Sequence, residues 1–284
     1  MKTLVYLSLA LIFFIGSVHA QDFQGIATYK TQRKLDIKLD STQVPSEMQE
    51  QLLAMMKKQF EKEYTLDFNK DASLYKVVES LETPTVGGGG MQIVVAGAGE
   101  ADVLYKNISE NRLANKSDIF GKTFLIKDSL PELEWTLTKE TKNIGEYTCF
   151  KATRTESRTV QASFNRNDGE VGEQDKKGTQ TTTEEVTVTA WYTPQIPLGH
   201  GPGRHYGLPG LILEISDGTQ SILCSKIVLN PKDGVKVEEP TKGKKVTQEE
   251  YNAIMEEKMK EMRDRYQPDN RRGNGNSFEI RIGG

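Results

Sequence analysis

The most informative segment of the chain reads Gly207-Leu208-Pro209-Gly210-Leu211-Ile212-Leu213-Glu214-Ile215. Pro209 presets φ for the second position of a turn and Gly210 accepts a positive φ at the third, so the sequence predicts a type II turn over residues 208–211. That turn would lead into a buried strand at 211–215, and Gly207 would permit the close approach of a neighbouring backbone. We expect a rigid connection between two strands. A ligand or partner contact is the alternative, because loops often carry binding function.

Alternating apolar and polar residues on both sides of this segment predict a β-rich chain. A first strand begins at residues 23–29, and its alternation continues through Leu35, Ile37 and Leu39. The further expected strands cover residues 64–68, 73–78, 102–108, 120–126, 134–139, 147–154, 186–193, 211–215 and 220–229. Such alternation is typical of a sheet that is wet on one face, so we expect antiparallel pairing.

Two segments have the start signals of helices. Ser46 with Gln49 predicts a helix over 46–63, whose apolar positions are Met48, Leu52, Met55, Met56 and Phe60. Thr247 with Glu250 predicts a second, charged helix that ends near residue 266. We therefore expect a mainly β (α+β) fold, in which a twisted antiparallel sheet or half-barrel packs with a helix from the N-terminal half, plus a charged C-terminal helix.

The domain organisation follows from composition. Residues 1–20 form a signal segment, residues 21–230 a β-rich domain, and residues 231–284 a charged helix and polar tail. Residues 86–100 are glycine-rich, and residues 165–185 have Val171 as their one large apolar side chain, so both are expected to be flexible insertions. Residues 278–282 alternate again and can form an edge strand or an interaction tail.

The N-terminus has the layout of a secretory signal peptide. A basic Lys2 precedes an apolar stretch over 4–15, and Val18-His19-Ala20 fits cleavage after Ala20. The apolar stretch is shorter than the roughly 20 residues that a bilayer span needs. A cysteine that could carry a lipid is missing at the expected cut. We expect a periplasmic protein without a transmembrane segment.

The charge balance and the two cysteines narrow the possible classes of protein further. The chain carries 37 basic and 40 acidic side chains, so it lacks the basic excess of a nucleic-acid-binding protein. The two cysteines, Cys149 and Cys224, lie in the exported part, where an oxidising compartment permits a disulfide. Two buried thiols are the alternative, because spacing alone does not bring two Cα atoms within bridging range.

The sequence contains few candidates for metal-binding or catalytic residues. Apart from His19, the histidines are His200 and His205, which are weak candidates for a zinc or copper site because their spacing fits no common metal motif. They are not accompanied by the Gly-x-Ser-x-Gly motif of a hydrolase. Met255, Met259 and Met262 form a stripe with Tyr251 that indicates a packing or partner face. We expect no catalytic residues and no cofactor.

Residues Gly207 to Ile212 resemble the signature of the GLPGLI family, which is known chiefly from Bacteroidota genomes. The supporting matches are Phe23-x-Gly25 with Tyr29, Lys142-x-Ile144-Gly145-x-Tyr147-x-Cys149-x-Lys151-Ala152, Ala190-Trp191-Tyr192-Thr193, Ile196-Pro197, Gly201-Pro202 and Glu214. The sequence departs from the family pattern at 87–99, at 165–185 and beyond Pro240. The resemblance implies an exported β-rich protein, often encoded near TonB-dependent outer-membrane receptors, with no established catalytic activity.

These observations favour a non-enzymatic accessory protein that binds another envelope or outer-membrane component, such as a TonB-dependent receptor system. The contact would lie at a sheet edge, the tail or the signature loop. One alternative is a carrier that holds a small apolar ligand or lipid between the sheet and the helix at 46–63. A third hypothesis is periplasmic handling of copper or zinc. The sequence does not indicate an oligomeric state.

Overall fold

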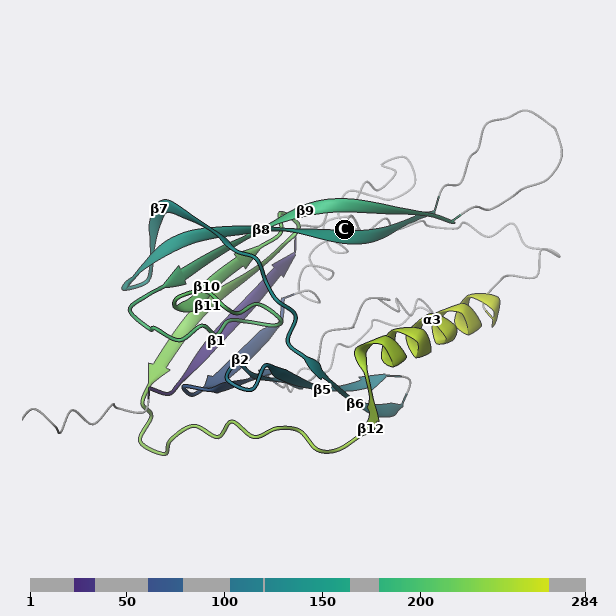
Figure 1. The fold of residues 1–284 in the computed structure, drawn as a ribbon, viewed down its shortest axis with the longest axis horizontal. Helices are drawn as coiled ribbons and strands as arrows, with labels where there is room; N and C mark the ends of the chain where they lie inside the picture. The colour runs from purple at the N-terminus through teal and green to yellow at the C-terminus, as the bar shows by residue number, and fades with distance from the viewer. Residues whose placement is uncertain (1–22, 34–60, 79–102, 120, 164–178, 266–284) are drawn as a thin grey trace, which may run out of the picture.

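The computed structural model describes residues 23–33, 61–78, 103–119, 121–163 and 179–265. These residues form one twelve-stranded sheet and one helix (Figure 1). The strand order is β12-β6-β5-β4-β3-β2-β1-β11-β10-β9-β8-β7. Apart from β12, the sheet consists of two runs of antiparallel neighbours that meet where the first strand pairs with the eleventh.

The first run contains six strands that follow one another in both sequence and space. Their bounds are β1 Gly25–Arg33, β2 Glu63–Phe68, β3 Ala72–Val77, β4 Val103–Asn107, β5 Arg112–Ile119 and β6 Lys122–Ser129. Each strand pairs antiparallel with the next. Asn111, at the turn before β5, has a φ of 51°, a conformation that asparagine tolerates better than most residues.

The second run contains β7 Thr136–Ile144, β8 Tyr147–Ser163, β9 Thr179–Thr193, β10 Leu211–Ser216 and β11 Gln220–Leu229. These strands are also antiparallel, and β11 pairs with β1 from Gly25↔Leu229 to Arg33↔Gln220. The sheet curves, with β7 to β9 in its upper part and β5 and β6 in its lower part in the view of Figure 1. The curve has an inner face, defined here by Tyr29, Tyr64 and Leu104, which are almost completely buried.

The lower half of the sheet is covered on both faces. The helix α3 (Gln248–Arg265) packs on the inner face, where the Tyr251 ring meets Phe124 edge-on and its hydroxyl lies 3.2 Å from the Ser117 hydroxyl. On the opposite face, the chain that leads to β12 (Lys244–Val246) packs Val237 against buried side chains of β3 to β6. Glu239 from the same segment pairs with Arg112 and Lys127.

The expected fold class is wrong in two respects. The sheet is mixed, because β12 pairs parallel with β6. The long segment before β12 crosses the outer face instead of making a tight turn, so β12 reaches the sheet in the same direction as β6. In addition, the helix seen on the sheet is α3 of the C-terminal part, because Phe124, Ile126 and Tyr251 form the apolar seam there. An N-terminal-half helix is not seen: residues 46–60 lie outside the described residues, and Glu63 belongs to β2.

Several element boundaries also differ from expectation. Two strands were not expected, β5 and the three-residue β12. Residues 179–185, expected to belong to a flexible insertion, lie in β9 instead. The start of α3 is confirmed, because Thr247 and Glu250 exchange hydrogen bonds as a capping box. The signal segment, the glycine-rich insertion and the tail at 278–282 lie outside the described residues.

Candidate functional site

The glycines of the hexapeptide have the opposite roles to those expected. Gly207 has a φ of 89°, whereas Gly210 does not adopt a positive φ, so the predicted type II turn is wrong. A Cβ on Gly210 would lie 2.1 Å from the Thr193 carbonyl oxygen, so close approach of the end of β9 is what requires glycine there. The Leu211 N–H donates to the Ile196 carbonyl at 2.9 Å instead of closing a turn with Leu208. The expected buried strand is confirmed as β10.

The loop between β9 and β10 is held against the inner face by a buried lysine. Lys106 of β4 is 1% exposed, and its Nζ donates to the carbonyl oxygens of Gly201, Gly203 and His205 at 2.8, 2.7 and 3.0 Å. The three acceptors match the three protons of an ammonium group. Burial, with the nearby charge of Arg204, lowers the pKa of Lys106 to about 7. This contact ties the two runs of the sheet together through the loop.

The two histidines occupy different environments. His200 is fully buried, its Nε2–H donates to the Asn69 carbonyl at 2.9 Å, and its ring lies 6.2 Å from Phe68. His205 lies beside Trp135. Burial lowers the pKa of His200 to about 4 and of His205 to about 3, so both imidazoles are neutral at physiological pH. Among the described residues, no group of three or more His, Cys, Asp and Glu side chains could hold a metal ion.

The remaining residues of the signature mainly make packing contacts with buried side chains. Tyr192, Leu208 and Ile212 share one buried cluster, and a Cβ on Gly201 would lie 2.7 Å from the Ile212 Cδ1. Pro202 is buried, whereas Pro209 is exposed. The Lys142 ammonium lies 4.4 Å from the centre of the Trp191 ring. These contacts support the expectation of a rigid connection between strands.

Lys142 also forms an ion pair of 2.7 Å with Glu214 of β10, two residues after the hexapeptide ends. The pair and the Trp191 contact join β7, β9 and β10 on one face of the sheet, since Glu214 is opposite Trp191 in the register. Of the residues that carry the family resemblance in the sequence, Lys142, Trp191 and Glu214 are thus brought together. They form a packing contact that is partly open to solvent.

Cys149 and Cys224 are free, buried thiols. They lie on β8 and β11, which are separated in the sheet by β9 and β10. Three strand spacings of about 4.8 Å exceed the roughly 7 Å limit on the Cα separation of a disulfide, even in a curved sheet. The geometry therefore favours the alternative of two buried thiols.

One part of the sheet extends as a two-stranded ribbon. Residues 154–163 of β8 pair with residues 179–188 of β9, from Arg154↔Val188 to Ser163↔Thr179. The pairing of β7 with β8 stops at Thr153, and that of β10 with β9 stops at Thr189. Within the described part of the chain, both outer edges of the ribbon are therefore without a neighbouring strand. The ribbon projects beyond the ends of the other strands in Figure 1.

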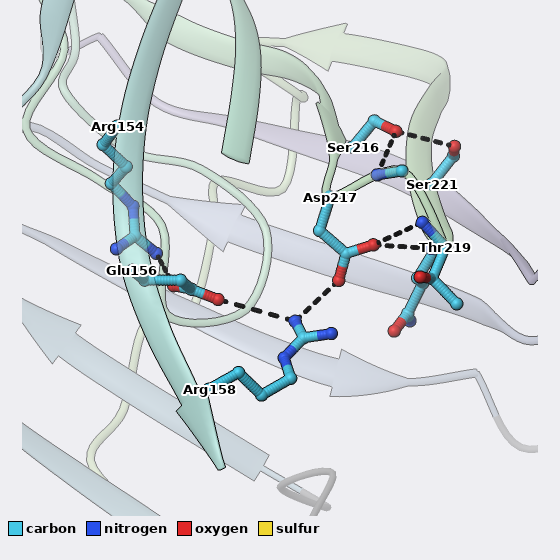
Figure 2. A network of polar contacts seen from close by, with 9 residues as sticks. Arg154, Glu156, Arg158, Ser216, Asp217, Thr219 and Ser221 are labelled. Atoms are coloured by element: carbon cyan, nitrogen blue, oxygen red, sulfur yellow. Dashed lines mark hydrogen bonds and ion pairs between the residues drawn. The ribbon is translucent and has the colours of Figure 1, made fainter. Parts of the chain in front are cut away.

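A chain of ion pairs fixes the root of the ribbon (Figure 2). Arg154, Glu156 and Arg158 alternate along β8 and so share one face. Arg154 donates to Glu156 at 2.6 Å, and Arg158 donates to Asp217 at 2.7 Å, in the turn between β10 and β11. Burial alone would raise the pKa of Asp217, but hydrogen bonds from the Gln220 N–H and Arg158 lower it below its usual value. The Arg154 guanidinium also lies 5.3 Å from the centre of the Trp135 ring.

Sequence reasoning missed Lys106, the ion-pair chain and the length of the ribbon. Lys106 is a single basic residue in a short strand, and its partners lie 95 to 99 residues away, so it leaves no local pattern. The ribbon had a signal: Thr and Val recur through residues 179–188, and these residue types favour strands.

Comparison with known proteins adds a family match to this geometry. Residues 135–214 match the model of a family described as a protein of unknown function (Porph_ging). The matched segment contains the ribbon, the loop and most of the hexapeptide strand, and it begins at Trp135 beside the ion-pair chain. No curated protein matches the chain.

Two solved structures of PNGF-II, in space groups C2 and P21, are similar to this chain. Their TM-scores are 0.45 and 0.46, with 13% and 12% sequence identity. The similarity covers 82% of this chain but 32% and 33% of those chains, so this chain spans about a third of their length. A likeness at this level carries no conclusion about function. In the described part of the chain, no helix is long and apolar enough to cross a membrane.

Proposed function

We propose that this chain is an exported, non-enzymatic accessory protein of the GLPGLI family that binds an extended segment of another envelope protein along its β8–β9 ribbon. The observation that carries the proposal is the ribbon, whose two outer edges have no neighbouring strand among the residues that the structure describes. The layout of residues 1–20 and the family resemblance support the envelope as the compartment. An outer-membrane receptor system is the partner that the resemblance favours.

Free strand edges present unpaired N–H and C=O groups that pair readily with another extended chain. Natural proteins usually shorten or cover such edges, and an isolated two-stranded hairpin is marginally stable in water. Here ten paired positions continue past the last neighbouring strand on either side. A third strand on one edge would stabilise the ribbon, so its length is better explained by a binding role than by the needs of the fold.

The root of the ribbon suits this role. The Arg158–Asp217 ion pair joins β8 to the β10–β11 turn and so holds the ribbon in a set direction relative to β10 and β11. A projecting element with a rigid base loses less conformational freedom on binding than a flexible loop does. The partner would contribute main-chain hydrogen bonds, with specificity from side chains such as Thr183, Glu184 and Glu185, which are exposed.

A shortened ribbon tests the proposal directly. Arg158 and Glu184 are opposite each other in the register, so residues 159–183 can be replaced by Asn-Gly, which forms a two-residue hairpin turn. The variant keeps Arg158 and its ion pair with Asp217. Crosslinking in intact cells, followed by affinity purification and mass spectrometry, should recover a specific envelope protein with the wild-type chain and lose it with the variant.

Lys122→Gln, at an exposed position beside the β5–β6 turn, is the matched control and should retain the partner. The melting temperature of the shortened chain should stay within a few degrees of the wild-type value, which shows that the sheet is intact. Recovery of the same partner by the shortened chain would contradict binding through the ribbon. Recovery of the bait alone from the wild type would contradict the accessory role.

A further inference from the structure

Two buried polar atoms beneath the β9–β10 loop have no hydrogen-bond partner among the residues that the structure describes. They are the hydroxyl oxygen of Ser73 and the Nδ1 atom of His200, and both residues are 0% exposed. Buried polar groups are almost always hydrogen-bonded, and leaving one without a partner costs stability. The two atoms therefore indicate a bound partner that supplies the missing hydrogen bonds.

The register places both atoms in the same part of the interior. Ser73 of β3 is opposite Phe68 of β2 and Lys106 of β4, and cross-strand partners share a face of the sheet. The Phe68 ring lies 6.2 Å from the His200 ring. On the other side of Ser73, Lys106 donates to the carbonyl oxygen of Gly201, the residue after His200. Ser73 therefore lies between two side chains that both reach the loop at residues 200–201.

The hydrogen bond on the other nitrogen of His200 restricts what can bind. Nε2 lies 2.9 Å from the Asn69 carbonyl oxygen, which can only accept, so Nε2 carries the proton of the neutral ring. Nδ1 is then an acceptor, and its partner must have an O–H or N–H donor. An anion such as chloride lacks this donor. A metal cation is disfavoured because the positive charge of Lys106 acts on the same ring.

The surroundings restrict the size of the partner. Phe68 and Lys106, on either side of Ser73, are at most 1% exposed, so the space is closed to solvent. Water is a very small molecule that can donate to Nδ1 and also exchange a hydrogen bond with a hydroxyl. Buried water molecules typically make about two to four hydrogen bonds, and Ser73 and His200 supply two.

We propose that one water molecule is bound between the Ser73 hydroxyl and the Nδ1 atom of His200, and that it joins β3 to the β9–β10 loop. The site is independent of the ribbon and of the function proposed for it. With the bonds that Lys106 donates, the water gives the loop a second attachment to the inner face. It also keeps His200 in the tautomer that donates to Asn69.

A crystal structure of the protein, at a resolution that shows ordered water, tests the proposal. One water molecule should lie within about 3.2 Å of both Ser73 Oγ and His200 Nδ1. A direct hydrogen bond between Ser73 and His200, or the absence of ordered water between them, would overturn the proposal. This result on the wild type does not depend on whether any variant folds.

The ¹⁵N resonance of His200 Nδ1 gives a second test in solution, because it reports whether this atom accepts a hydrogen bond. Ser73→Val replaces the hydroxyl by methyl groups, so the resonance should move towards that of a free imidazole nitrogen. Thr65→Val is the matched control: the Thr65 hydroxyl is also buried and unpartnered among the described residues, but it alternates with Tyr64 and Leu66 and so lies on the opposite face. It should leave the resonance unchanged. An unchanged resonance in Ser73→Val, or equal shifts in both variants, would contradict the proposal.

Discussion

The hydroxyl of Tyr29 donates a 2.7 Å hydrogen bond to the carbonyl oxygen of Ile212, and both residues are completely buried. The bond joins the first strand to the end of the hexapeptide across 183 positions of sequence. Burial, with the nearby Cys224 and Tyr75, raises the pKa of Tyr29 well above its ordinary value, so the phenol stays protonated and remains a donor. Two residues that carry the family resemblance, far apart in the sequence, therefore meet in one contact.

Tyr29→Phe should lower the free energy of unfolding by about 1–3 kcal/mol, because the buried carbonyl loses its phenol donor. Tyr192→Phe is the control. Tyr192 is also buried, but its hydroxyl makes no hydrogen bond within the described part of the chain, so its removal should cost less than about 1 kcal/mol. Urea unfolding of both variants measures the difference. Equal losses would show that the bond to Ile212 does not stabilise the fold.

The glycine pair of the hexapeptide gives a second prediction. Gly210→Ala should destabilise the protein by about 3 kcal/mol or more, because its Cβ would overlap the Thr193 carbonyl. Gly207→Ala has open space around its Cβ and should cost about 1–2 kcal/mol, the penalty for a left-handed backbone. Thermal unfolding compares the two. A larger loss at Gly207 would instead support the turn that the sequence predicts.

Lys106→Met should remove the attachment of the β9–β10 loop and leave three carbonyl groups without their donor. Since a hydrogen bond from a charged group is worth about 1.5–3 kcal/mol, we expect a loss of at least about 3 kcal/mol. Lys30→Met, which removes an exposed ion pair with Glu63, should cost less than about 1 kcal/mol. Hydrogen exchange should show faster exchange of the Gly207 and Ile212 amides in Lys106→Met. Unchanged exchange there would mean that Lys106 does not hold the loop.

The lowered pKa of His200 predicts that the fold loses stability in acid. Burial, with the nearby charge of Lys106, lowers its pKa to about 4 in the folded chain, against about 6.5 in the unfolded chain. Stability from a neutral His200 is therefore fully present above pH 6.5 and is lost as the pH falls through 4. The loss amounts to about 3 kcal/mol for a shift of this size.

His200→Gln can still donate to the Asn69 carbonyl, but it does not titrate. Urea unfolding between pH 7 and 4 should show that the difference in stability between wild type and variant shrinks, or changes sign in favour of the variant, as the pH falls. A difference that stays constant with pH would contradict a buried neutral histidine.

Sequence patterns predicted the parts of the fold that depend on residues close together in the chain. The capping box at Thr247 and Glu250 defines the start of α3, because both hydrogen bonds are made within one turn. Strands with one apolar face were also found. β5 was missed because its inner face contains the polar Asn115 and Ser117, whose burial depends on strands and a helix from elsewhere in the chain.

Features that depend on distant contacts could not be predicted in this way. The need for glycine at Gly210 comes from Thr193, which a turn pattern does not include. Residues 183–185 of the ribbon strand are exposed, and the sequence of 179–185 has no apolar alternation, so it resembles a hydrophilic loop. The candidate binding element was therefore the part of the sheet that sequence periodicity described least well.

Site-specific photo-crosslinking from the ribbon is the most direct test of the proposed function. A benzophenone amino acid replaces Ser157, which is exposed on the ribbon, or Lys122 beside the β5–β6 turn as the control position. After irradiation of intact cells, the Ser157 position should give one discrete covalent adduct with another envelope protein, and the Lys122 position should not. Absence of an adduct from Ser157, or the same adduct from both positions, would contradict binding along the ribbon.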